Sequence, residues 1–195
     1  MLDAVFRNRF EGYLAPAAAR LSALRVRADG LTASVFVLTA VAALDIAHRN
    51  YLLGLGLLVA ARALDALSGP LARLEGATAF GAYLDLVLDL IGGALIPFAF
   101  ALAMPDRTLA AMFLMLGLVA RAAAATAAAR LQDSGPILAG LEQASALVGK
   151  TELFVAFAAA CVFPNWFSLI AYVVGILCFV AVGSRVAANA VSLRP

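Results

Sequence analysis

The chain has 195 residues, of which 65% are hydrophobic and only 13% are charged, and its mean hydropathy is +1.00. Soluble domains are about half apolar and about a quarter charged, so this composition excludes an ordinary soluble domain and indicates an integral membrane protein. The formal net charge of +2, from scattered arginines, is too small to indicate nucleic-acid binding.

The first 30 residues hold five arginines and no apolar core followed by a cleavage site, unlike a signal peptide. We expect residues 1–30 to form a basic, amphipathic juxtamembrane helix that lies on the membrane surface.

Six apolar runs follow, each close to the roughly 20 residues that cross a bilayer core about 30 Å thick. They are residues 31–47, 51–72, 79–104, 108–129, 144–163 and 166–184. The breaks between them are short, except for residues 130–143, which contain the turn sequence Asp-Ser-Gly-Pro. Since no repeat or linker divides the chain, we predict one all-α domain over residues 1–195, with a six-transmembrane-helix bundle over residues 31–190.

The distribution of arginines predicts the orientation of this bundle. With six spans, both termini and the second and fourth connections share one side, which holds Arg7, Arg9, Arg20, Arg25, Arg27, Arg73, Arg130, Arg185 and Arg194. The other side holds only Arg49 and Arg107. The positive-inside rule therefore places both termini in the cytoplasm, and we expect a multi-pass protein of a bacterial inner membrane.

Two carboxylates stand out in the third run. Asp85 and Asp89 are the only charged residues between positions 79 and 104. An ionisable group at mid-bilayer costs at least ~2.5–3.5 kcal/mol on insertion scales, so each needs a partner, water or a nearby interface. At i and i+4 they lie on one helix face and repel each other unless a cation lies between them. A divalent metal ion with oxygen ligands would remove the conflict.

The preceding run carries a third acid, Asp65, and Arg73 follows near the predicted cytoplasmic end. A short connection would bring both towards the face of Asp85 and Asp89. Three carboxylates and an arginine at the cytoplasmic mouth suit a metal-bound phosphate or diphosphate.

Other charges within the spans are as well explained by structural ion pairs. Arg62, Arg121 and Glu152 fall in this group.

These residues resemble the CDP-alcohol phosphotransferase (CDP-alcohol phosphatidyltransferase) family, whose pattern is D-x-x-D-G-x-x-A-R followed by G-x-x-x-D-x-x-x-D. Here the first part reads Asp65-Ala-Leu-Ser68-Gly69-Pro-Leu-Ala72-Arg73, and after seven residues the second reads Gly81-Ala-Tyr-Leu-Asp85-Leu-Val-Leu-Asp89. Every fixed position is met except the second acid, which is Ser68. The length, the six runs and the place of the motif fit the family as well.

The resemblance implies a metal-dependent membrane transferase of phospholipid biosynthesis. Such an enzyme moves a phosphatidyl or similar phosphoryl group from a CDP-linked donor, such as CDP-diacylglycerol, to an alcohol and releases CMP. Asp65, Asp85 and Asp89 would hold two Mg²⁺ or Mn²⁺ ions. Asp89 would also be the general base, while Gly69, Ala72, Arg73 and Gly81 would form the nucleotide pocket. The family also implies a homodimer.

We expect residues of the later spans to line the pocket for the acceptor alcohol. The candidates are Arg121, Arg130, Lys150 and Glu152.

Ser68 leaves several readings open, because a hydroxyl is a weaker and neutral metal ligand. The protein is an enzyme that completes its metal shell with Ser68 and water, or a silent relative that binds a CDP-lipid or nucleotide without turnover, or a chain in which the serine was introduced. A small transporter that uses the buried acids for ion coupling is a further alternative, disfavoured by the absence of an internal repeat.

Overall fold

The computed structural model describes residues 16, 19–20, 27–76, 78–131 and 149–192. All regular structure within these ranges is helical. The long helices are α2 (Ala28–Ala47), α3 (Tyr51–Glu75), α4 (Ala79–Ala103), α5 (Thr108–Leu131) and α8 (Phe167–Ser192), with a shorter α7 (Lys150–Val162). Two 3₁₀ turns, η1 (Pro105–Arg107) and η3 (Pro164–Trp166), precede α5 and α8.

Five of the described helices are long and apolar enough to cross a membrane: α2, α3, α4, α5 together with η1, and α8 together with η3. They correspond to the first four and the last of the predicted runs. The all-helical membrane class is therefore confirmed.

The predicted fifth span, residues 144–163, is represented by α7. This helix begins at Lys150, because Gly149 has an extended backbone, and its 13 residues measure about 20 Å. Residues 144–148 lie outside the described part of the chain, so the count of six spans stays a prediction. The same holds for the amphipathic helix over residues 1–30, almost all of which lie outside it, and for the cytoplasmic placement of the termini.

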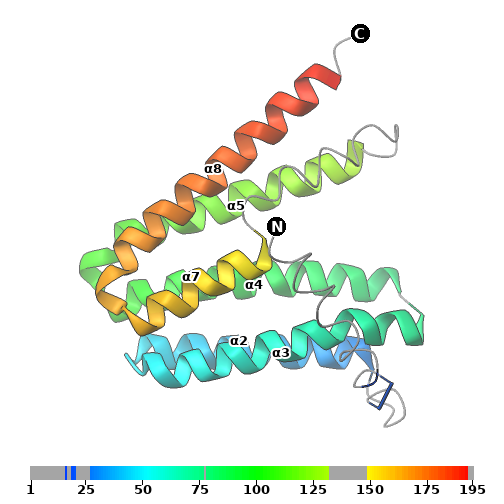
Figure 1. The fold of residues 1–195 in the computed structure, drawn as a ribbon, viewed down its shortest axis with the longest axis horizontal. Helices are drawn as coiled ribbons and strands as arrows, with labels where there is room; N and C mark the ends of the chain where they lie inside the picture. The colour runs from blue at the N-terminus through cyan, green and yellow to red at the C-terminus, as the bar shows by residue number, and fades with distance from the viewer. Residues whose placement is uncertain (1–15, 17–18, 21–26, 77, 132–148, 193–195) are drawn as a thin grey trace.

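The helices form a bundle in which α2 packs against both α3 and α4, and α5 packs against α4 and α8 (Figure 1). Helix α7 packs against α3 and also contacts α8. The α5–α8 seam is close, because glycines face each other across it: a Cβ on Gly117 would lie 3.3 Å from the Cα of Gly175. Many large apolar side chains, such as Leu52, Leu109 and Ile176, are exposed on the outside, as expected of a surface that faces lipid.

Aromatic stacking and arginine hydrogen bonds connect the helices at one end of the bundle. The ring of Phe100 stacks on Phe167 at 4.4 Å and on Tyr51 at 5.8 Å between centroids. Arg49 donates to the backbone oxygen of Ala103 at 3.0 Å, and Arg107 donates to that of Pro164 at 2.7 Å. These contacts join the α2–α3, α4–η1 and α7–η3 connections at one end. The motif aspartates lie towards the other.

Candidate functional site

The connection between α3 and α4 is short and turns sharply. Gly76 ends α3 with a φ of +90°, in the left-handed region that favours glycine. Thr78 then caps α4, since its hydroxyl accepts a hydrogen bond from the Gly81 amide at 3.0 Å. The C-terminal half of α3 and the N-terminal half of α4 therefore lie at the same end of the bundle, each supported by α2.

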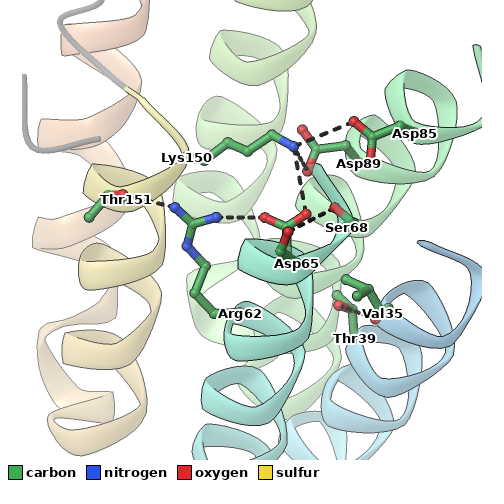
Figure 2. Close-up of polar contacts among 9 residues, drawn as sticks. All are labelled: Val35, Thr39, Arg62, Asp65, Ser68, Asp85, Asp89, Lys150 and Thr151. Carbon is green, nitrogen blue, oxygen red and sulfur yellow. Dashed lines mark hydrogen bonds and ion pairs between the residues drawn. The ribbon is translucent and has the colours of Figure 1, made fainter. Parts of the chain in front are cut away.

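This arrangement brings Asp65 of α3 together with Asp85 and Asp89 of α4, and we call these residues the three-acid cluster. Lys150, the first residue of α7, extends its side chain into the cluster (Figure 2). Its Nζ lies 3.3 Å from Asp89 Oδ1, 3.9 Å from Asp85 Oδ2 and 4.0 Å from Asp65 Oδ1. One ammonium group thus contacts all three carboxylates, from a residue that the sequence indicated only for the acceptor pocket.

A second cation, Arg62, forms an ion pair with Asp65. Its Nη1 donates to Asp65 Oδ2 at 2.6 Å, and its Nη2 donates to the Thr151 hydroxyl at 2.9 Å (Figure 2). Arg62 therefore links α3 to α7 and orients the carboxylate. Sequence reasoning left Arg62 and Thr151 outside the site, although the i, i+3 spacing of Arg62 and Asp65 already permitted an ion pair.

The remaining motif residues lie around the cluster. Ser68, half-buried, donates its hydroxyl to the backbone oxygen of Asp65 at 2.8 Å. Gly69 is exposed, and a Cβ added there would meet nothing within 4 Å. Gly81 is different, because an added Cβ would lie 2.7 Å from the Asp29 carboxylate of α2. Ala72 is half-buried and Arg73 exposed, both beyond the cluster towards the end of α3.

A cavity of about 430 Å³ opens beside the three-acid cluster. Its polar lining includes the three aspartates, Arg62, Lys150 and Arg121, together with Thr32, Thr39 and Thr126. Most of the rest is apolar and reaches core residues such as Leu58, Ile96 and Phe157. The cavity thus joins a charged mouth to an apolar interior.

The four residues expected at the acceptor pocket have different positions. Arg121 and Lys150 line the cavity. Glu152 accepts a hydrogen bond from the Gly149 amide at 3.0 Å and so caps the start of α7. The side chain of Arg130 lies outside the described part of the structure.

The three-acid cluster has the chemistry of a divalent-metal site, since carboxylate oxygens are the ligands that Mg²⁺ and Mn²⁺ prefer. Its arrangement is that of an ion-pair cluster around Lys150. Among the residues that the structure describes, no group of three or more histidine, cysteine, aspartate or glutamate side chains is placed to hold a metal ion. The donors fit the ion, and their present geometry fits an ammonium group.

Comparison with known proteins supports the family resemblance that the motif indicates. The family model for CDP-alcohol phosphatidyltransferase matches residues 25–184. The "Inner membrane protein YnjF" of Escherichia coli (strain K12) is 31% identical over 201 residues, which cover 100% of this chain and 98% of that protein.

Two crystal structures of Mycobacterium tuberculosis phosphatidylinositol phosphate synthase (PgsA1) share the fold. The one with CDP-DAG bound has a TM-score of 0.73 at 18% identity and covers 89% of this chain and 92% of that one. The other, in complex with manganese and citrate, has a TM-score of 0.72 at 16% identity and covers 89% and 87%.

Proposed function

This chain belongs to the CDP-alcohol phosphatidyltransferase family, and from that premise we propose that it transfers a phosphatidyl group from CDP-diacylglycerol to an alcohol and releases CMP. The observation that carries the proposal is the meeting of Asp65, Asp85 and Asp89 at the mouth of a largely apolar cavity. A diphosphate with lipid chains needs both parts: charged groups at one end and apolar surface next to them.

In the proposed reaction, the acceptor hydroxyl oxygen attacks the phosphorus that bears the diacylglycerol. A new P–O bond forms, the P–O bond to the CMP phosphate breaks, and CMP leaves with the electron pair. The family resemblance assigns the hydroxyl proton to Asp89, the last acid of the motif, and its exposed position in the cavity lining is compatible with that role.

Asp65, Asp85 and Asp89 would hold the divalent ion, Mg²⁺ or Mn²⁺, which when bound neutralises charge on the leaving CMP. Two ions are expected from the family resemblance, and Ser68 would weaken the one that depended on a fourth acid. Arg62 keeps Asp65 turned into the cluster through its bond to Thr151.

The nucleotide would lie over the ends of α3 and α4, against Gly69, Ala72 and Arg73. The family pattern adds Gly81, although in this structure the Asp29 carboxylate of α2 lies against that glycine. The open space around Gly69 and the exposure of Arg73 support this placement. Arg121 would face the acceptor from the α5 wall of the cavity. These roles are proposals that follow from the family pattern.

We place the site at the cytoplasmic face of an inner membrane, in a six-span homodimer. The arginine distribution supports the orientation, and the name of the E. coli relative supports the membrane. The homodimer follows from the family resemblance alone.

The test is CMP release by the purified chain, supplied with CDP-diacylglycerol, Mg²⁺ or Mn²⁺ and a panel of alcohols: glycerol phosphate, inositol, inositol phosphate, serine and choline. We expect release with at least one acceptor and loss of release on chelation. Turnover that persisted after both Asp85→Asn and Asp89→Asn would contradict the proposal.

A second candidate is a silent relative that binds a CDP-lipid or nucleotide without turnover. Ser68 in the place of an acid favours it, since the cluster holds one negative charge fewer than the family pattern. It predicts nucleotide-dependent thermal stabilisation without CMP release, and a gain of release in Ser68→Asp. Release by the unaltered chain would exclude this candidate.

A further inference from the structure

We infer that Lys150 is a built-in counter-cation that competes with the divalent metal ion for the three-acid cluster. This inference rests on the proposed function for the identity of the competing ion. Its structural basis is the position of one ammonium group 3.3–4.0 Å from an oxygen of each aspartate.

The contacts of Lys150 explain why the two cations exclude each other. A Mg²⁺ ion needs its ligand oxygens at about 2.0–2.1 Å. An ion held by oxygens of the cluster would therefore lie next to the present position of the Lys150 ammonium. Two cations so close repel each other, even though water screens them in part, since the side chains of Lys150, Asp85 and Asp89 are 41–45% exposed. Binding of the metal thus requires the ammonium to leave.

The tether allows that movement without disturbing the helices. Lys150 is the first residue of α7, its side chain is 41% exposed, and it has a flexible four-carbon stem. The helix itself is held by other contacts, between Thr151 and Arg62 and between Glu152 and the Gly149 amide. The ammonium can therefore swing into the cavity while α7 stays in place.

Charge balance gives the direction of the effect. Three carboxylates carry three negative charges, and Lys150 and Arg62 together compensate two of them. Ser68 adds none where the family pattern has a fourth acid. The chain without substrate should therefore bind Mn²⁺ weakly, and removal of the Lys150 charge should strengthen binding.

The experiment measures free Mn²⁺ by electron paramagnetic resonance, with the purified full-length chain in detergent micelles and no substrate. We expect Lys150→Met to lower the dissociation constant for Mn²⁺ at least about tenfold. Lys150→Arg, which keeps the charge, should bind as weakly as the unaltered chain. Arg107→Met removes a cation at the other end of the bundle, where it contacts Pro164, and should change nothing.

An unchanged or weaker affinity in a folded Lys150→Met would overturn the inference, as would tighter binding in Lys150→Arg. Lys150→Gln carries the same test if the methionine variant does not fold. Failure here is separable from failure of the proposed function, because CMP release is measured independently. Release by the unaltered chain with no gain of Mn²⁺ affinity in Lys150→Met would refute only the counter-cation. A gain of affinity without any release would refute only the transferase.

Discussion

Replacement of Arg62 by methionine should destabilise the protein, because this side chain joins two helices at the site. Methionine keeps most of the length and the apolar stem but removes the guanidinium. Asp65 then loses its 2.6 Å bond and the Thr151 hydroxyl loses its 2.9 Å bond. Helix α7 would lose the Arg62–Thr151 bond to α3 and keep only the longer ion pair of Lys150 with Asp65, at 4.0 Å, among the contacts described above.

The size of the effect follows from these two bonds. A hydrogen bond to a charged group contributes about 1.5–3 kcal/mol, and a second, to a neutral hydroxyl, about 1 kcal/mol. The side chains of Arg62 and Asp65 are 28% and 18% exposed, so water screens the pair only in part. We take the loss as about 3 kcal/mol, which for a chain of this size lowers Tm by about 6–12 °C.

The assay is thermal unfolding in detergent micelles, with Thr151→Val as the matched control. That variant removes the second bond and leaves the Arg62–Asp65 bond in place, and it should lower Tm by about 2–4 °C. A double variant, Arg62→Met with Asp65→Asn, should lose about 1–2 kcal/mol less than the sum of the single losses, because the two residues share an interaction. A melting temperature of Arg62→Met within 1–2 °C of the unaltered chain (a shift far below the roughly 6–12 °C expected) would refute the reasoning.

Three further predictions test separate parts of the structure. Asp89→Asn should reduce CMP release by about 10²–10⁴-fold through loss of the proton acceptor. Asp106 is exposed at the other end of the bundle, so Asp106→Asn should leave release unchanged, and equal rates in the two variants would contradict the role of Asp89. Gly69→Ala should keep or slightly raise Tm, since the added Cβ meets open space and alanine favours a helix by up to about 1 kcal/mol. The same change should raise the KM for the CDP donor, and an unchanged KM would remove Gly69 from the nucleotide pocket. Gly175→Ala should lose about 1–3 kcal/mol in thermal unfolding, because its Cβ would lie 2.6 Å from the Phe113 ring. Gly183→Ala, in the same helix but with no atom within 4 Å, should keep or slightly raise Tm, and similar melting temperatures of the two variants would argue against the close α5–α8 seam.

The sequence located most helices well, because long apolar runs and turn residues report directly on membrane crossing. The starts of α3, α4 and α5 coincide with the predicted ones. The last helix extends to Ser192, well beyond the predicted end at residue 184. Hydropathy marks the edge of the apolar run, and the helix continues past it through residues that include Arg185 and Asn189.

The site was harder to predict, because its cations come from different helices. The sequence predicted the three acids of the site from their spacing and from the apolar residues around them. These are Asp65, Asp85 and Asp89. The contact of Lys150 with all three acids depends on how α7 packs against α3, which no local pattern specifies. The Arg62–Thr151 bond spans 89 positions. Side-chain direction across a bundle is a tertiary property, so charge and spacing predicted a divalent metal ion between the acids but not the Lys150 ammonium that the structure places there.

The most direct test of the transferase is the ratio of CMP released to phosphodiester lipid formed. The purified chain in liposomes would receive CDP-diacylglycerol, Mn²⁺ and the alcohol panel, and both products would be quantified together. We predict equal amounts of CMP and of a lipid that carries the alcohol, and neither product with Asp89→Asn. CMP without a new lipid would indicate hydrolysis, and no product from the folded chain with any alcohol would contradict phosphatidyl transfer.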